Sequence, residues 1–226
     1  MAKKLVLFDI DGTLLDSGRA GTRALDHAFA EVFSIEDAFE GIRMSGKTDI
    51  EIIKEAMRKH SLSVDGKIPV IMEAYIRHLR REIDNPEKHL KPGIREAVNI
   101  LNIMSRVELG LLTGNIEEGA RIKLGAFGLN EYFQIGAFGS DEEDRNRLLP
   151  IAAERFRSRY GEDISYKDVV VIGDTPRDVE CAKPYGAFTM AVATGPYTAA
   201  QLLASGADSV LEDLSDTRFF IARLNL

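Results

Sequence analysis

The chain has 226 residues, of which 45% are hydrophobic and 29% are charged, and its formal net charge is −7. This composition is typical of a globular protein that forms one large domain or one domain with an insertion. The acidic balance argues against non-specific nucleic-acid binding, and no apolar run approaches the roughly 18 residues that a membrane span needs. The single cysteine, Cys181, excludes an internal disulfide and favours a reducing compartment, so we expect a cytoplasmic protein with neither nucleic acid nor membrane as its partner.

The first predicted strand ends in two carboxylates. Residues 5–8 are consecutive apolar residues, which predict a buried strand of a parallel sheet, and Gly12 then marks a turn. Because side chains alternate along a strand, Asp9 and Asp11 point the same way, and their charges repel. A divalent metal with one protonated carboxyl relieves that repulsion, and such a pair can attack a phosphorus atom through one carboxylate and pass a proton through the other. The simpler alternative is a strand that ends in a polar turn.

The next segment is helical. From about Asp16 to Lys88, apolar residues recur at helical spacing in three stretches, within residues 24–32, 50–57 and 69–79, with no convincing strand. The pattern predicts a small helical bundle inserted into the chain. We therefore expect a core of residues 1–15 and 90–226 and an inserted helical domain of residues 16–89.

From about residue 89 the pattern alternates between helix and strand. A turn is predicted at residues 89–93, where Pro92 and Gly93 open a helix. Such alternation is typical of a doubly wound parallel α/β sheet. Predicted helices cover residues 92–104, 116–126, 150–160, 177–185 and 199–205, predicted strands cover 107–112, 133–138, 169–172, 189–193 and 208–211, and a helix closes the chain.

Polar residues directly follow three of the predicted strands. Besides the two carboxylates after the first strand, the second strand ends in Thr113-Gly114-Asn115 and the fourth ends in Gly173-Asp174. In open parallel sheets the ligand crevice lies at the carboxyl edge of the strands. The three strands therefore predict the same location for a site.

These motifs together resemble those of a known family. The chain resembles the haloacid dehalogenase-like (HAD) superfamily over essentially its whole length, and within it the phosphatases similar to phosphoglycolate phosphatase. The resemblance implies a Rossmann-like α/β core with a helical cap of the C1 type that closes over the site, and a small phosphorylated metabolite as substrate. The residues that carry it are Asp9-x-Asp11-Gly12-Thr13, Thr113-Gly114-Asn115, Arg145 and Arg147, and Gly173-Asp174 with Asp178.

The resemblance implies a role for each carboxylate. Asp9 would be the nucleophile that forms an aspartyl-phosphate, and Asp11 would protonate the leaving group and later take a proton from water. Mg²⁺ prefers hard oxygen ligands, which Asp9, the backbone carbonyl of Asp11, and Asp174 would supply. Asp178, one helical turn beyond Asp174, would support the metal site without binding the ion.

The family pattern also implies how the phosphoryl group is held. Thr113 and the backbone NH of Gly114 would hydrogen-bond its oxygens, and the neighbouring Asn115 would contribute to the substrate site. Gly12 is required because the backbone must approach the phosphate closely.

The basic residue departs from the family pattern. Family members usually place a Lys at the start of the helix after the third strand, and this chain has none there. Arg147, three residues before Pro150, has the matching spacing, and Arg145 lies two residues upstream. Either guanidinium could neutralise Asp9 and the phosphoryl group, and each could equally be a solvated charge in an acidic loop.

Within the predicted cap, Gly46, Lys47 and Thr48 form the stretch expected to touch the substrate. The hypothesis is that Lys47 reaches a negative charge on the leaving group, as a carboxylate-bearing substrate would require. Residues 41–48 also match the P-loop pattern Gly-x-x-x-x-Gly-Lys-[Ser/Thr], which gives a remote NTPase alternative. A P-loop must follow a buried strand, however, and residues 34–40 are acidic and not strand-like.

The sequence also bears on three other functions, a phosphomutase, a dehalogenase and a binding module. A phosphomutase of the β-phosphoglucomutase type shares every motif and differs in whether water or a sugar hydroxyl accepts the phosphoryl group. A dehalogenase is disfavoured because its halide needs no proton from Asp11, and a non-catalytic binding module is disfavoured by the intact carboxylates. We expect a Mg²⁺-dependent phosphatase, whose particular substrate and oligomeric state the sequence does not set.

Overall fold

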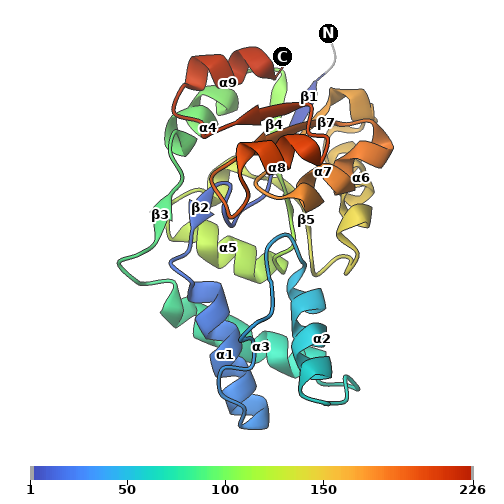
Figure 1. Ribbon diagram of the computed structural model, residues 1–226. Coiled ribbons are helices and arrows are strands. Elements are labelled where there is room, and N and C mark those ends of the chain that lie inside the picture. The colour runs from blue at the N-terminus through green and yellow to red at the C-terminus, as the bar shows by residue number, and fades with distance from the viewer. Residues whose placement is uncertain (1–2, 225–226) are drawn as a thin grey trace.

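The protein, described here by a computed structural model over residues 3–224, is built around a six-stranded sheet (Figure 1). Its strands are β1 (Lys4–Phe8), β4 (Val107–Thr113), β5 (Ile135–Phe138), β6 (Val169–Gly173), β7 (Phe188–Val192) and β8 (Ser209–Leu211). They lie in the order β5-β4-β1-β6-β7-β8, and every neighbouring pair is parallel. The apolar strand β1 therefore has a partner on both sides, which places the residues that follow it at the middle of the carboxyl edge.

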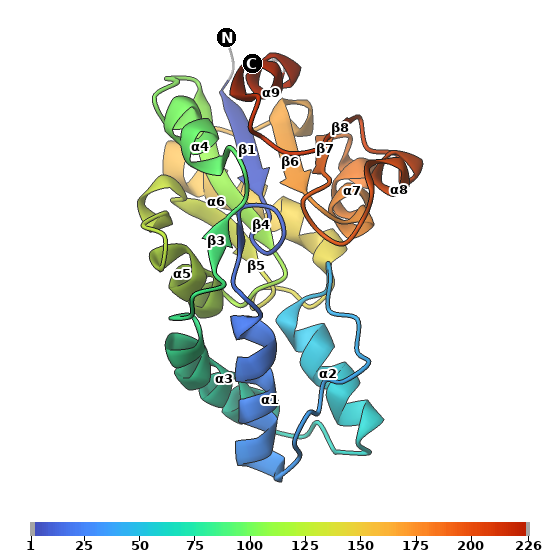
Figure 2. The same ribbon diagram turned by 60° about the vertical axis from the view of Figure 1, so that its left-hand side comes forward.

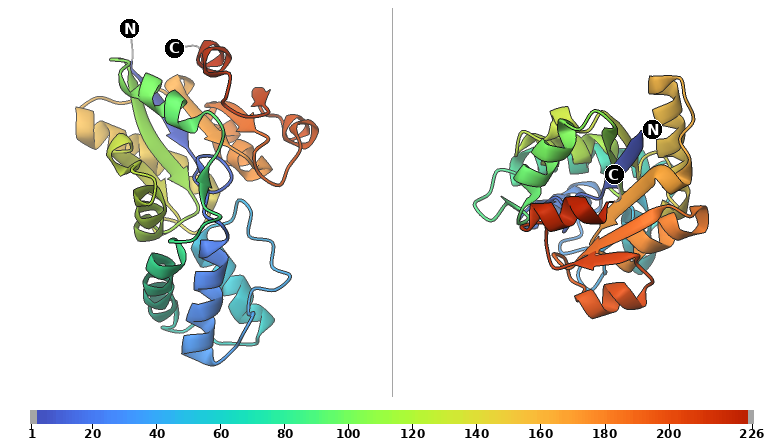
Figure 3. Two further views of the ribbon diagram at one scale, coloured as in Figure 1. Left: turned by 90° about the vertical axis from the view of Figure 1, so that its left-hand side faces the viewer. Right: turned by 90° about the horizontal axis from the view of Figure 1, so that it is seen from above.

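Helices cover both faces of the sheet (Figure 3). Side chains alternate along β1, so Val6 and Phe8 pack into one hydrophobic cluster while Leu5 and Leu7 pack into another on the opposite face. The first cluster includes residues of α4 (Ile94–Asn102), α5 (Glu117–Gly125) and α9 (Thr217–Arg223), the second includes α6 (Leu148–Tyr160) and α7 (Pro176–Ala182), and α8 (Ala199–Ala204) lies beside β7.

Three helices form a separate unit at the carboxyl edge of the sheet (Figure 2). They are α1 (Ala20–Phe33), α2 (Asp49–Lys59) and α3 (Ile68–Glu82), and their buried apolar residues make one cluster. Ile116, which precedes α5 in the core, belongs to the same cluster, so the helical unit packs directly on the sheet edge. The amphipathic spacing seen in the sequence is what gives each helix one buried face.

The chain enters and leaves this helical unit through a two-stranded antiparallel ribbon. Leu15 of β2 (Leu15–Asp16) pairs with Leu90 of β3 (His89–Leu90). The turn predicted at residues 89–93 is therefore wrong for residues 89–90, which form a strand. The sequence did not indicate this strand because two residues are too few to show an alternating pattern. The ribbon lies at the predicted boundaries of the insert, and the division into two domains stays a prediction.

The predicted fold, a doubly wound parallel sheet with an inserted helical cap, is confirmed, with small shifts at element ends. The strand predicted from residue 133 begins at Ile135, because residues 130–132 form a 3₁₀ turn and Phe133 packs into the core. The helix predicted from Pro150 begins at Leu148, since a proline in the first helical turn leaves no intrahelical bond unmade. Among the described helices, none is long and apolar enough to cross a membrane.

Candidate active site

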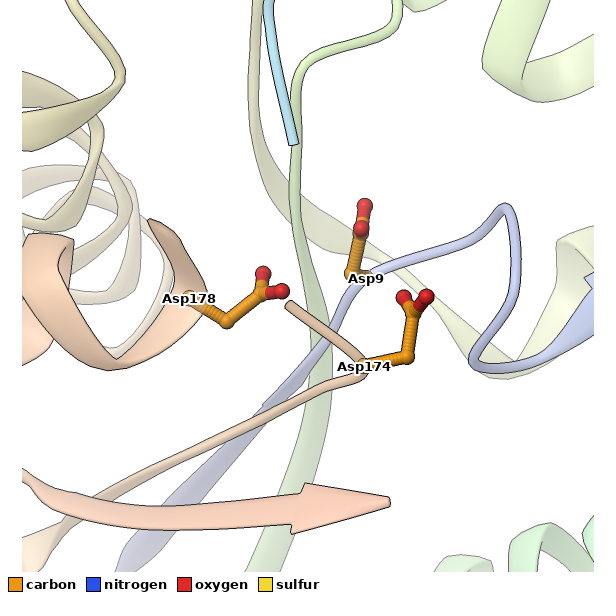
Figure 4. Close-up of side chains that lie close together, drawn as sticks. All are labelled: Asp9, Asp174 and Asp178. Atoms are coloured by element: carbon orange, nitrogen blue, oxygen red, sulfur yellow. The ribbon is translucent and has the colours of Figure 1, made fainter. Parts of the chain in front are cut away.

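Three buried carboxylates meet at the carboxyl edge of the sheet. Asp9 follows β1, Asp174 follows β6, and Asp178 lies in the first turn of α7. Each offers an oxygen within 4.8 Å of the others, and Figure 4 shows their carboxylates around a common space. The pairing of β1 with β6 causes this convergence, because it brings the residues after two neighbouring parallel strands together. A cluster of hard carboxylate oxygens fits the ligand preference of Mg²⁺.

Asp178 differs from the other two because the protein engages both of its oxygens. Its Oδ2 accepts hydrogen bonds from the backbone NH of Thr175 (2.9 Å) and from the Thr175 hydroxyl (2.8 Å), which caps α7. Its Oδ1 is paired with Arg145. Both oxygens of Asp178 are therefore engaged by the protein, and its role of supporting the metal site from outside stays a prediction.

Of the two candidate arginines, the structure brings only Arg145 to the carboxylates. Arg145 is 4% exposed, and its Nη2 lies 3.2 Å from Asp9 Oδ2. Its Nη1 donates to the carbonyl oxygen of Gly46, 3.3 Å away in the helical unit, while its Nε is buried without a hydrogen-bond partner among the described residues. Arg145 therefore joins the site to the helical unit.

Arg147 points away from the site. Its side chain is 71% exposed and lies between Glu142 and Asp144, at 3.8 and 3.7 Å. These are surface ion pairs, which contribute little to stability. The spacing that favoured Arg147 in the sequence thus does not place it near the three carboxylates.

Burial dominates the electrostatics of the cluster. It raises the pKa of Asp9 to about 6, although Arg145 and a hydrogen bond from Thr113 act in the opposite direction. Burial, together with Asp178 and Asp9, raises the pKa of Asp174 well above its ordinary value. A bound divalent cation would oppose this effect of burial, because it favours the charged carboxylates.

The Asp11 carboxylate lies apart from this cluster and contacts a second group of residues. Its Oδ2 accepts hydrogen bonds from Asn115 Nδ2 (2.9 Å) and from the Lys123 ammonium (2.5 Å). Lys123 also donates to Asn115 Oδ1 at 2.6 Å and is 4% exposed. Burial lowers the pKa of Lys123, but Asp11 and Asp49 outweigh that effect, so its pKa lies above the ordinary value.

Sequence reasoning missed Lys123. The available signal was its position in α5, three residues after the buried Ala120 and next to the buried Leu124, where an amphipathic helix carries apolar residues. A lysine in an apolar stripe is ambiguous, because its long stem can carry the charge to the surface.

The end of β4 and the loop after it contribute Thr113, Gly114 and Asn115. The Thr113 hydroxyl accepts a hydrogen bond from Asn115 Nδ2 at 2.9 Å, and both residues are buried. Gly114 lies against the helical unit, because a Cβ there would overlap the carbonyl of Lys47. This loop therefore contacts both the site and the cap.

Two glycines allow the backbone to pass close to Asp174. Gly12 has φ +83°, and a Cβ at Gly12 or at Gly195 would overlap the Asp174 carboxylate. The Thr13 hydroxyl donates to Asp174 Oδ1 at 3.0 Å. The sequence predicted a close approach of Gly12 to the phosphate, which stays a prediction, and the structure shows a close approach to Asp174 instead. Gly195 lies in a loop that no motif marked.

The predicted substrate stretch of the cap divides into two parts. Gly46 and Lys47 line the cavity at the site, although the Lys47 ammonium is paired with Glu55 of α2. Thr48 is fully buried and caps α2, where its hydroxyl oxygen accepts from the backbone NH of Glu51 at 3.2 Å. The structure therefore brings Gly46 and Lys47 to the cavity and places Thr48 in the helix cap behind it.

The cavity between the sheet edge and the helical unit has a volume of about 440 Å³. Asp9, Asp11, Asp174, Lys123 and Arg145 line its floor, and residues of the cap line its other side. This volume suits a small ligand. The backbone before Gly41 is α1 followed by turns rather than a strand, so residues 41–48 lack the setting that a P-loop requires.

The fold and the site define the class of the protein. The family model described as haloacid dehalogenase-like hydrolase matches residues 6–192, and the chain belongs to this family of hydrolases. The predicted family and the predicted enzyme class are thus confirmed.

Two proteins named phosphoglycolate phosphatase are similar to this chain over most of its length. A phosphoglycolate phosphatase of Vibrio vulnificus is 24% identical over 94% of this chain and 93% of its own length, and one of Synechococcus elongatus is 26% identical over 93% of each. Among solved structures, CbbY from Rhodobacter sphaeroides in complex with xylulose-(1,5)-bisphosphate superposes with a TM-score of 0.76 at 20% identity, over 95% of this chain and 96% of CbbY. The structural likeness shows the shared fold.

Proposed function

We propose that this protein is a Mg²⁺-dependent phosphatase that hydrolyses a small phosphomonoester through an aspartyl-phosphate on Asp9. The observation that carries the proposal is the ion pair of Asp9 with the buried Arg145, next to Asp174 and below a cavity of about 440 Å³. A nucleophilic carboxylate, a cation-binding cluster and a fixed guanidinium are the parts that phosphoryl transfer needs, because this chemistry depends on positioning and charge neutralisation.

The chain's own residues divide the reaction into two steps. In the first, an Asp9 oxygen bonds to phosphorus while the bond to the leaving oxygen breaks, and Asp11 gives that oxygen a proton. In the second, Asp11 takes a proton from water as the water oxygen displaces Asp9 and releases inorganic phosphate. Arg145, the Thr113 hydroxyl and the backbone of Gly114 hold the phosphoryl oxygens. Asp9, the carbonyl of Asp11, and Asp174 would hold Mg²⁺, which when bound neutralises the negative charge of the phosphoryl group.

The helical unit, residues 16–89, acts in this proposal as a cap that excludes water and selects the substrate. Its contact with the core supports this role, because Asp49 accepts a hydrogen bond from the backbone NH of Ile116 (2.9 Å) and Arg145 donates to Gly46. The proposed compartment is the reducing cytoplasm, which the buried free thiol of Cys181 favours.

The proposed substrate is a small ester of the phosphoglycolate type. The relatives named phosphoglycolate phosphatase support this assignment, as does the position of Lys47 at the cavity. If Lys47 meets a negative charge of the leaving group, Lys47→Ala should lower kcat/KM for 2-phosphoglycolate by tenfold or more and leave an uncharged aryl phosphate nearly unchanged. Equal losses on the two esters would remove Lys47 from substrate selection.

The test is a panel of small phosphorylated metabolites, including 2-phosphoglycolate, with Mg²⁺ and with the Asp9→Asn variant as the control. The expected result is Mg²⁺-dependent release of inorganic phosphate that Asp9→Asn abolishes. Transfer of the phosphoryl group to another hydroxyl of the substrate, with little free phosphate, would favour a phosphomutase. Nucleotide hydrolysis that survives Asp9→Asn but is lost in Lys47→Ala would favour the P-loop alternative. No turnover of any ester would favour a binding protein.

A further inference from the structure

The contact between Lys123 and Asp11 is not explained by the roles given so far. The Lys123 ammonium is buried at the boundary between the core helix α5 and the helical unit, and it contacts both Asp11 Oδ2 (2.5 Å) and Asn115 Oδ1 (2.6 Å). Asn115 in turn donates to Asp11 Oδ2 at 2.9 Å. Asp11, Asn115 and Lys123 thus form a closed triangle of hydrogen bonds, in which each residue contacts the other two.

A buried ammonium is costly unless it is paired, so its location needs a reason. Gly21 of cap helix α1 lies beside this ammonium, since a Cβ there would be in ordinary van der Waals contact with Lys123 Nζ at 3.4 Å. Asp49 of the cap adds negative charge near the same ammonium. The cap and the core therefore both shape the pocket around this one cation.

The position of the triangle connects it to the reaction. Asp11 is two residues from Asp9, and its side chain is 42% exposed to the cavity, whereas the side chain of Lys123 is only 5% exposed. Without a partner, a half-exposed carboxylate would sample several rotamers. The hydrogen bonds from Lys123 and Asn115 to its Oδ2 limit that freedom.

We propose that Lys123 is a positioning residue that holds the Asp11 carboxyl in place for proton transfer to the leaving group. The inference rests on the proposed function, because it assigns Lys123 a task only if Asp11 is the general acid. Within residues 3–224, Lys123 forms no hydrogen bond with Asp9, Asp174 or Asp178, so it acts through Asp11.

The decisive experiment compares two esters that differ in their need for a proton. An alkyl ester such as 2-phosphoglycolate has a poor leaving group, whereas p-nitrophenolate leaves without protonation. In Lys123→Met, kcat/KM for the alkyl ester should fall by about 10² to 10³, which lies within the range of about 10² to 10⁴ that general acid catalysis supplies. The first turnover of p-nitrophenyl phosphate, measured as a burst of p-nitrophenolate, should change by less than about fivefold. Asp11→Asn should show the same selectivity.

A double variant separates positioning from a general structural effect. Because Lys123 acts through Asp11, adding Lys123→Met to Asp11→Asn should cause little further loss, whereas independent roles would multiply the losses. Arg121→Met is the matched control, since Arg121 lies on the same helix but contacts the carbonyl of Phe133 instead of the site. It should leave the ratio of the two ester rates unchanged.

Several results would overturn the assignment. They are an equal loss on both esters in Lys123→Met, a multiplicative loss in the double variant, and a crystal structure of Lys123→Met in which Asp11 keeps its contact with Asn115. The last measurement needs no turnover, so it tests the assignment even where activity is low. Failure of the proposed function would instead show as unchanged hydrolysis of both esters in Asp9→Asn.

Discussion

Arg145 and Asp9 form a buried ion pair, in which Arg145 Nη2 lies 3.2 Å from Asp9 Oδ2 and neither side chain is more than 7% exposed. The same guanidinium also pairs with Asp178. One cation thus stabilises both the proposed nucleophile and the residue that caps α7. Asp178 and Asp9 in turn raise the pKa of Arg145 above its ordinary value against the effect of burial, so the guanidinium stays charged.

The first prediction concerns the role of Arg145 in catalysis. Arg145→Met should lower kcat by about 10² to 10³, the cost of removing one fixed group that stabilises transition-state charge. Arg147→Met is the control and should stay within about twofold, because its side chain is 71% exposed and pairs only with surface carboxylates. Steady-state kinetics on any ester that the protein hydrolyses measures kcat for the two variants. A larger loss in Arg147→Met than in Arg145→Met would reverse the assignment.

The second prediction concerns metal binding and pH. Burial raises the pKa of Asp9 to about 6, so in the metal-free protein Asp9 carries a proton below that pH. A metal ligand must be deprotonated, and the Kd for Mg²⁺ should therefore rise at least tenfold for each unit that the pH falls below 6. The raised pKa of Asp174 should steepen this dependence.

Titration calorimetry with Mg²⁺ between pH 5 and 8.5 measures this dependence. In two buffers of different ionisation enthalpy it should also show proton release on binding near pH 6. Asp9→Asn should bind more weakly and with a shallower pH dependence, because one titrating ligand is gone. An affinity that does not change across this range would contradict Asp9 and Asp174 as ligands.

The parts of the site that the sequence predicted are those with local signals. Asp9 and Asp174 directly follow apolar strands and Thr113 is the last residue of another, and parallel pairing alone brings such residues to one edge. The choice between Arg145 and Arg147 has no such signal, because two residues in one 3₁₀ turn point in different directions and only the packing shows which one is buried. The ribbon of β2 and β3 was missed because two residues show no period.

Lys123 could not be predicted for a different reason. Its partner Asp11 lies 112 positions earlier in the sequence, and the position of Lys123 among the apolar residues of α5 does not show whether its charge is buried or reaches the surface. The same holds for Gly195, whose importance depends entirely on a carboxylate from another loop. Contacts between distant loops are set by tertiary packing, which local patterns do not encode.

The third prediction concerns Gly195. In Gly195→Ala the new methyl group would occupy the position of the Asp174 carboxylate, so Asp174 must move and the Kd for Mg²⁺ should rise by tenfold or more. The control is Gly119→Ala in α5, where a Cβ would have ordinary contacts of 3.4 Å or more and alanine favours the helix. Gly119→Ala should bind Mg²⁺ normally. Equal affinities in the two variants would show that Asp174 does not depend on the backbone at Gly195.

The fourth prediction concerns the stability of the cap contact. Asp49 is 7% exposed, and burial raises its pKa from 3.8 to about 6, although Lys123 and a hydrogen bond from the backbone of Ile116 lower it. Because the folded protein holds this proton more tightly than the unfolded chain, ionised Asp49 opposes folding. The cost is absent below pH 3.8, grows as the pH rises to 6 and is complete above it. At about 1.4 kcal/mol per unit it amounts to about 3 kcal/mol.

Asp49→Asn removes this cost, because the asparagine oxygen can still accept the hydrogen bond from Ile116 and its amide can face the cavity that Asp49 lines. The variant should therefore be more stable than the unaltered protein by up to about 3 kcal/mol at pH 8, with a difference that shrinks toward zero as the pH falls from 6 to 4. Urea unfolding of the metal-free protein at several pH values measures it. Asp163→Asn, at a side chain that is 87% exposed, should show no such trend. A variant that is less stable at pH 8 than at pH 5, relative to the unaltered protein, would mean that the Asp49 charge helps to hold the cap on the core.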